Sequence, residues 1–188
     1  MRKLAVFNHV SLDGYFVDAN GDMSWARAHQ QDPEWNAFVA ENASGSGALV
    51  FGRITYEMMA RFWPTPMAIE MMPAVAAGMN TMPKYVFSRT LHEASWSNTT
   101  LVKADLATAV RALKLESAPD MVILGSGSVV AQLAPAGLID EYQVVVNPIV
   151  LGRGRTMFDG VAEKLPLQLT RTRAFQNGNV LVCYRPMG

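Results

Sequence analysis

Hydrophobic residues in the first two-thirds of the chain form short continuous runs, and segments with helical spacing separate them. The runs 4–10, 48–51, 84–87 and 121–124 predict buried strands. Between them, apolar residues recur every three or four positions, which predicts helices that begin at Pro33, near Thr55, after Asp105 and after Ser128. Alternation of strands and helices is typical of a parallel sheet covered by helices.

The last third of the chain has a different pattern. Residues 142–146, 167–175 and 180–184 predict strands without helices between them, and Asn177-Gly178 is a strong hairpin signal. We therefore expect a β-meander here. The whole pattern predicts a three-layer α/β fold, with a mixed, mostly parallel sheet, flanking helices and a C-terminal antiparallel hairpin. Without a repeat or linker, residues 1–188 are expected to form one domain.

Methionines are concentrated between Pro66 and Met82. The segment predicts a helix that packs against the core or against a partner subunit, since methionine fills irregular apolar gaps. A soft, polarisable wall for a flat ligand is the alternative.

Composition and charge narrow the function classes. Half of the residues are hydrophobic, 17% are charged, and 16 basic residues balance 16 acidic ones. Without net charge or a block of like charges, neither a nucleic-acid partner nor a membrane surface is expected. The first apolar run is too short for a secretory signal, and the single cysteine, Cys183, cannot form an internal disulfide. These features favour the cytoplasm.

Three predicted strands end in small, polar or cationic residues: Gly52-Arg53-Ile54-Thr55, Ser88-Arg89-Thr90 and Gly125-Ser126-Gly127-Ser128. In open α/β sheets, ligands bind at the carboxyl ends of the strands. The glycine-rich turn suits a pyrophosphate, because backbone N–H groups at the start of a helix bind anions. A purely structural strand-to-helix turn is the alternative. The turn is not the dinucleotide-binding fingerprint, because Val130 replaces its third glycine.

Arg53 and Arg89 each stand next to hydroxyl residues. Guanidinium and hydroxyl groups together can bind a phosphate monoester. Two such clusters and a pyrophosphate loop predict NADPH as the cofactor, since its 2′-phosphate needs cationic partners that NADH does not. Two solvated surface arginines are the alternative interpretation.

The same residues carry a family resemblance. The chain resembles the dihydrofolate-reductase-like superfamily, and especially bacterial proteins related to the reductase domain of the bifunctional riboflavin-biosynthesis deaminase/reductase. The matching motifs occur in the family's order over nearly the whole chain: Ser11-Leu12-Asp13-Gly14, Leu49-Val50-Phe51-Gly52-Arg53-Ile54-Thr55-Tyr56-Glu57, Val86-Phe87-Ser88-Arg89-Thr90, Ile123-Leu124-Gly125-Ser126-Gly127-Ser128-Val129, and Leu138-Ile139-Asp140-Glu141 followed by Asn147-Pro148-Ile149-Val150-Leu151-Gly152.

The resemblance implies roles by position. It implies that Gly52, Arg53, Thr55, Ser88 and Arg89 hold the adenosine end and the 2′-phosphate of NADPH. It places the pyrophosphate on the loop formed by Gly125, Ser126, Gly127, Ser128 and Val129, and the nicotinamide beside Asp13 and Gly14. The family often has two glycines joined by a cis peptide where this chain has Gly125-Ser126. It also implies a homodimer.

On the substrate side, the candidate binding residues are Asn8, Asp13 and Trp25. Asn8 interrupts an apolar strand, where a buried amide needs partners, and a neighbouring loop could provide them instead. Asp13 is the candidate proton donor, with a bound water or a turn-capping role as alternatives. Trp25 could equally belong to the core. His9, His29 and His92 show no metal-ligand spacing, so no metal is expected.

The leading hypothesis is an NADPH-dependent reductase that transfers hydride to a small, heterocyclic substrate. One alternative is a 5-amino-6-ribosylamino-pyrimidine(dione) reductase of riboflavin synthesis. Another is a nucleotide-binding protein without catalysis. True dihydrofolate reductases carry a pterin-binding carboxylate on the first helix, and no residue here matches it, so dihydrofolate is not the expected substrate.

Overall fold

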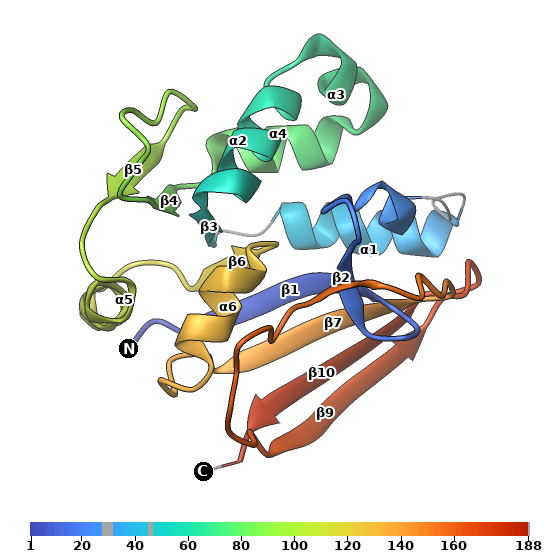
Figure 1. Ribbon diagram of the computed structural model, residues 1–188. Coiled ribbons are helices and arrows are strands. Elements are labelled where there is room, and N and C mark those ends of the chain that lie inside the picture. Colours follow the sequence, from blue (N-terminus) through green and yellow to red (C-terminus); the bar gives the residue numbers. More distant parts are fainter. Residues whose placement is uncertain (28–31, 45–46, 188) are drawn as a thin grey trace.

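An eight-stranded sheet with the order β5-β4-β3-β6-β1-β7-β10-β9 runs through the molecule (Figure 1). The computed structural model describes residues 1–27, 32–44 and 47–187. The six strands from β5 to β7 are parallel, and β10 is antiparallel to both β7 and β9. The strands are β1 (Leu4–Ser11), β3 (Ala48–Gly52), β4 (Lys84–Phe87), β5 (Thr99–Val102), β6 (Met121–Leu124), β7 (Glu141–Asn147), β9 (Leu167–Ala174) and β10 (Val180–Pro186).

Helices cover both faces of this sheet. The helices α5 and α6 pack on one face, where Val110, Val130 and Leu133 join a cluster with strand residues of β1, β3 and β6. The helices α1 to α4 pack on the other face in two further clusters. The helices are η1 (Ser24–Arg27), α1 (Pro33–Ala43), α2 (Arg53–Phe62), α3 (Pro66–Met71), α4 (Pro73–Thr81), α5 (Leu106–Leu115) and α6 (Gly127–Leu133). The predicted three-layer α/β fold is therefore confirmed.

A separate two-stranded antiparallel ribbon is formed by β2 (Tyr15–Asp18) and β8 (Gly154–Thr156). Neither strand is predicted by hydrophobic pattern, because each is short and follows another strand after a few residues. The edge strand β5 is also missed, since none of its residues is fully buried.

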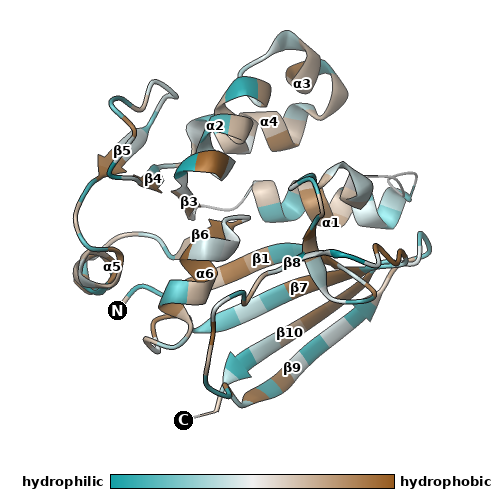
Figure 2. Cartoon of the chain, viewed as in Figure 1, coloured by the Kyte–Doolittle hydropathy of each residue, from teal (hydrophilic) through white to brown (hydrophobic). Residues whose placement is uncertain are grey.

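The predicted meander is wrong in its order, because β10 lies between β7 and β9. Burial explains the exchange. Leu181 and Cys183 of β10 are fully buried, whereas seven of the eight residues of β9 are exposed. The more apolar strand takes the inner position. Figure 2 shows the corresponding alternation of hydrophilic and hydrophobic residues along these strands.

The methionine-rich segment is two helices rather than one. The chain leaves helical geometry at Met72, immediately before Pro73, where α4 begins. Met79 and Met82 belong to the core, while Met67 and Met71 are exposed. A second adjustment concerns α2, which begins at Arg53, two residues before the predicted start. No helix in the described part of the chain is long and apolar enough to cross a membrane.

Candidate functional site

The three motifs that follow predicted strands meet at one edge of the sheet. The strands β4, β3 and β6 are parallel neighbours in this order, so their carboxyl ends point the same way. Gly52 is in register with Phe87, which places Arg53 and Ser88 side by side where their strands end. The predicted convergence of the motifs is thus present in the fold.

The loop after β6 has an unusual backbone. Gly125 and Ser126 both adopt left-handed conformations, with φ of 71° and 56°, and the peptide bond between them is trans. A side chain at Gly125 would come within 2.8 Å of the Thr55 methyl group. Glycine is therefore required at this position both for its conformation and for the close approach of α2.

The side chain of Asn8, on β1, forms hydrogen bonds with this loop. Its Oδ1 accepts a hydrogen bond from the Gly125 N–H at 2.7 Å, and its Nδ2 donates to the Gly125 carbonyl at 3.3 Å. Nδ2 also lies 3.0 Å from the sulfur of Met157. The side chain is almost completely buried. The structure thus places Asn8 against the glycine loop, with its amide bonded to protein groups.

Ser126 joins the loop to the start of α2. Its Oγ accepts from the Gly52 N–H at 2.8 Å, and its own N–H donates to Thr55 Oγ1 at 3.1 Å. Gly127 and Ser128 follow as the first residues of α6, where backbone N–H groups lack carbonyl partners within the helix. The arrangement presents polar backbone groups at the carboxyl edge of the sheet.

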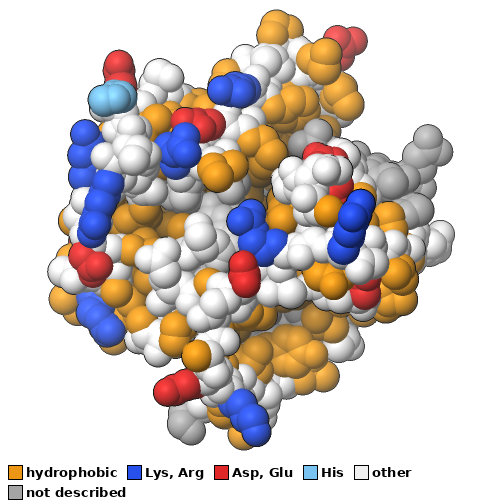
Figure 3. Space-filling view, in the orientation of Figure 1, with side chains coloured by type: hydrophobic (Ala, Val, Ile, Leu, Met, Phe, Trp, Pro, Cys, Tyr) orange, Lys and Arg blue, Asp and Glu red, His pale blue; other side chains and the backbone are white. Residues whose placement is uncertain are grey.

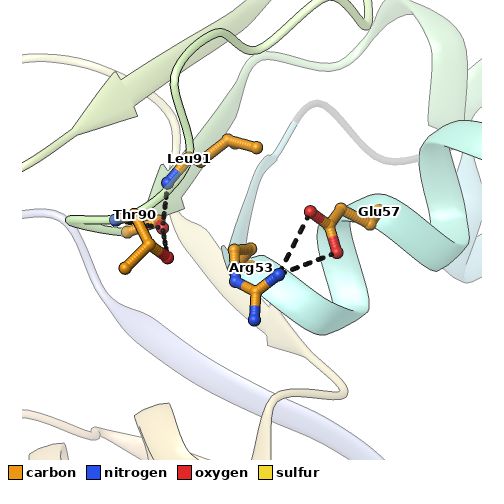
Figure 4. A network of polar contacts seen from close by, with 5 residues as sticks. Arg53, Glu57, Thr90 and Leu91 are labelled. Atoms are coloured by element: carbon orange, nitrogen blue, oxygen red, sulfur yellow. Dashed lines mark hydrogen bonds and ion pairs between the residues drawn. The ribbon is translucent and has the colours of Figure 1, made fainter.

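The end of β4 forms a compact polar turn beside Arg53 (Figure 4). Ser88 Oγ accepts from the N–H groups of Thr90 and Leu91 at 3.2 and 2.9 Å. Arg53 is partly exposed and pairs with Glu57 one helical turn later, at 3.3 Å. A half-exposed guanidinium in a surface ion pair of this kind can exchange its partner for a ligand at small cost.

Arg89 adds a second positive charge at this end of the sheet. The pKa of Asp105 is lowered, mainly by hydrogen bonds from Thr108 and in addition by the positive charge of Arg89. Asp105 follows the end of β5, so this strand, which was not predicted, also ends near Arg89. Figure 3 shows basic side chains gathered where Figure 1 places β4, β5 and α5, with others near the centre of the face.

Asp13 links the loop after β1 to the loop after β7 by hydrogen bonds. Its carboxylate accepts from Ser11 Oγ at 2.6 Å and from the N–H groups of Leu151 and Gly152 at 3.1 and 2.8 Å. These hydrogen bonds, that from Ser11 first, hold the pKa of Asp13 below its usual value. The carboxylate is therefore ionised at neutral pH. This environment suits a clamp between the loops better than a proton donor.

Trp25 lies in η1, which contacts β1. Its indole Nε1 donates to the Asp22 carbonyl at 3.1 Å, and the side chain is partly exposed. Trp25 is not among the residues of the three core clusters.

His9 and Asn147 form a polar pair that sequence reasoning missed. Asn147 is buried at the end of β7 and donates to the carbonyls of Val10 and Val145, both at 3.1 Å. Its amide also contacts His9 Nδ1. Burial lowers the pKa of His9 to about 4, so the imidazole is neutral at physiological pH. The signal was present: both residues are polar, and each stands where a predicted strand ends.

In the described part of the chain, no group of three or more His, Cys, Asp or Glu side chains could hold a metal ion. His29, one of the three histidines of the sequence, lies outside that part.

Comparison with known proteins assigns the family. The family model of the RibD C-terminal domain matches residues 2–181. The uncharacterised protein YyaP of Bacillus subtilis is 25% identical over 183 residues, covering 97% of this chain and 94% of YyaP.

Solved structures share the fold. The chain matches the diaminohydroxyphosphoribosylaminopyrimidine deaminase/5-amino-6-(5-phosphoribosylamino)uracil reductase of Thermotoga maritima with a TM-score of 0.69 and 15% identity, over 99% of this chain and 57% of that one. It matches the dihydrofolate reductase of Enterococcus faecalis, complexed with NADP(H), with a TM-score of 0.64 and 16% identity, over 99% and 97% of the two chains. The dihydrofolate-reductase-like fold expected from the motifs is confirmed.

Proposed function

The chain belongs to the RibD C-terminal domain family, and we propose that it is an NADPH-dependent reductase of a small heterocyclic substrate. The family relationship makes it homologous to reductase domains, which supports an oxidoreductase. The choice of NADPH and the kind of substrate are the parts that we propose. The observation that carries them is the junction of three polar strand ends at one edge of the sheet.

The ends of β4, β3 and β6 form what we call the cofactor side. In the proposal, Arg53, Ser88 and Arg89 bind the 2′-phosphate and adenosine end of NADPH. Gly52 and Thr55 join them, and the pyrophosphate lies along Gly125, Ser126, Gly127, Ser128 and Val129. The glycines of this side also pack closely against their protein neighbours: an added side chain at Gly127 would come within 3.2 Å of the Phe16 ring, and one at Gly52 within 3.4 Å of Val129.

The ends of β1 and β7 form the substrate side, next to β6 in the sheet. When bound, NADPH supplies the hydride, and the chain's own residues orient the reactants and exclude water. In the proposal, Asp13 holds the loop at Leu151 and Gly152 in place, and Trp25 offers an aromatic surface to a flat ring. Asn8 acts through Gly125, as a positioning residue. The lowered pKa of Asp13 disfavours this carboxylate as the proton donor, and in the proposal a water molecule supplies the proton that completes the reduction.

A reductase of a 5-amino-6-ribosylamino-pyrimidine(dione) is the second candidate, supported by the family relationship. A nucleotide-binding protein without catalysis would share the same cofactor side. Oxidation of bound NADPH by an added pyrimidine or pterin distinguishes both enzymes from that third possibility.

Cofactor binding tests the proposal directly. We expect calorimetry to give NADPH at least about tenfold higher affinity than NADH, since charge-assisted contacts contribute about 1.5–3 kcal/mol. Arg53→Ala should remove most of that preference and leave NADH affinity nearly unchanged. Arg185→Ala is the matched control, because Arg185 bonds to Gln168 at the far side of the sheet. Equal affinities for the two cofactors in the unmodified protein would contradict the proposal.

A further inference from the structure

His9 lies near the end of β1, on the substrate side, and points to the opposite face of the strand from Asn8. Asn8 contacts the glycine loop, and side chains alternate along a strand, so His9 faces α1. Its ring meets that of Trp35 of α1 edge-on, with the ring centres 5.6 Å apart, and that of Phe7 of β1 at 5.8 Å. These two contacts restrict the orientation of the imidazole.

Asn147, at the end of β7, determines which nitrogen of that imidazole carries the proton. Its Nδ2 donates to the carbonyls of Val10 and Val145, both at 3.1 Å, so both hydrogens of the amide have acceptors. Neither hydrogen is then left for His9 Nδ1, although Nδ2 lies 3.2 Å from it. The remaining hydrogen bond is the one that His9 Nδ1 donates to Asn147 Oδ1 at 3.4 Å. Neutral His9 therefore carries its proton on Nδ1, and Nε2 keeps a lone pair.

The Nε2 atom of His9 has no hydrogen-bond partner among the described residues. In that part of the chain, Oδ1 of Asn179 is the one side-chain N or O atom that is both shielded from solvent and without a partner. Nε2 is therefore accessible from outside, in agreement with the partial exposure of His9. Within the same ranges no group of metal-ligating side chains surrounds it, so its lone pair suits a hydrogen-bond donor rather than a metal.

The two acids at the start of α1 are already engaged. The Asp32 carboxylate accepts from the N–H groups of Glu34 and Asn177, and Glu34 pairs with Arg173 at 2.8 Å. Both carboxylates thus hold the hairpin of β9 and β10 against α1. Burial lowers the pKa of His9 to about 4, so its ring is neutral at pH 7 and Nε2 remains an acceptor.

We propose that His9 Nε2 accepts a hydrogen bond from an N–H group of the substrate, and that Asn147 is the positioning residue that holds the required tautomer. The contact with a substrate rests on the proposed function, whereas the tautomer does not. The inference narrows the substrate class to heterocycles with a ring N–H or an amino group on the edge that meets β1. An analogue without this donor would exclude water from Nε2 and leave its lone pair unpaired, which a binding site penalises.

The tautomer is tested first, on the unmodified protein at pH 7. Long-range proton–nitrogen correlation spectra of the histidine rings should show His9 with its proton on Nδ1. Asn147→Ala should increase the fraction with the proton on Nε2, because it removes the acceptor for Nδ1. A proton on Nε2 in the unmodified protein would overturn the inference, since Nε2 would then be a donor. An unchanged tautomer in Asn147→Ala would overturn the role of Asn147.

Two neutral rings of the same shape test the contact itself. 2-Aminopyrimidine carries an N–H donor where 2-methylpyrimidine carries a methyl group. With NADPH at saturation, the amino ring should bind at least about threefold more tightly, as expected for one neutral hydrogen bond, and should shift the nitrogen signal of His9 Nε2. His9→Phe should remove the preference, and His92→Phe, which replaces an exposed histidine after β4, should keep it. Equal affinities in the unmodified protein, or a preference that survives His9→Phe, would overturn the inference.

The same titration without NADPH separates this inference from the proposed function. If the protein binds no NADPH, the proposed function fails, while the tautomer and the cofactor-free titration still test His9 as an acceptor. If NADPH binds and the two rings bind equally well, the contact with His9 is overturned and the proposed function stands.

Discussion

The cofactor side and the substrate side are built in different ways. On the cofactor side, each motif follows its own strand, and the side chains of Asn8, Thr55 and Ser126 accept hydrogen bonds from backbone N–H groups of neighbouring loops. On the substrate side, exposed loops are joined by Asp13 and covered by a small ribbon. We propose that the first region is preorganised for the cofactor, whereas the second can vary with few consequences for the sheet. This is the division expected when one cofactor serves different substrates.

The largest effect should come from the residue that holds the glycine loop. In Asn8→Ala, the buried N–H and carbonyl of Gly125 both lose their partner. Leaving buried polar groups unpaired should lower the free energy of unfolding by about 2–4 kcal/mol, measured by urea denaturation. NADPH affinity should fall with it, since the proposed pyrophosphate loop is no longer held.

Asn20→Ala is the control for this variant, because Asn20 is exposed in the turn after β2. Its free energy of unfolding should change by less than about 1 kcal/mol. If Asn8→Ala is no less stable than Asn20→Ala, the loop does not depend on Asn8, and the contrast between the two sides is lost.

A smaller effect is expected from His9, beneath the substrate side. The pKa of His9 falls from 6.5 to about 4 on folding, so the unfolded chain binds its proton more readily. Stability should therefore decrease as pH falls from about 6.5 toward 4. Linkage gives about 1–2 kcal/mol between pH 7 and pH 5.

His9→Phe sharpens the measurement, because it keeps an aromatic ring against Phe7 and Trp35 and removes the titrating group. Its free energy of unfolding should vary less with pH over that interval than that of the unmodified protein. Identical pH dependence in the two proteins would mean that other groups produce the acid destabilisation.

The contrast also explains what could be predicted from the sequence. Gly125-Ser126-Gly127 and Arg53 could be placed correctly because strand, turn and helix signals are local, and parallel strands bring their carboxyl ends together. The contact of Asp13 with Leu151 and Gly152 spans most of the chain, and no local pattern encodes it. The pairing of β2 with β8 could not be predicted for the same reason, because the two strands are similarly far apart in the sequence. The burial of Asn8 could be predicted from the sequence, but its hydrogen bonds to both the N–H and the carbonyl of Gly125 could not.

The smallest effect concerns the clamp itself. Asp13→Ala removes the acceptor for the N–H groups of Leu151 and Gly152, on an exposed loop. We expect amide hydrogen exchange at these two positions to accelerate roughly fivefold to tenfold, because the groups open to water more often. Exchange at Gly125 and Ser126 should not change, since Asn8 and Thr55 hold them independently.

Asp18→Ala is the matched control for the clamp, because Asp18 also accepts from backbone N–H groups, but within its own turn. It should accelerate exchange at Asn20 and Asp22 and leave Leu151 and Gly152 as they were. Faster exchange at Gly125 in Asp13→Ala would show that the two sides of the sheet edge move together. The substrate-side loops would then be part of the cofactor scaffold, and a change of substrate specificity in this family would have to preserve both.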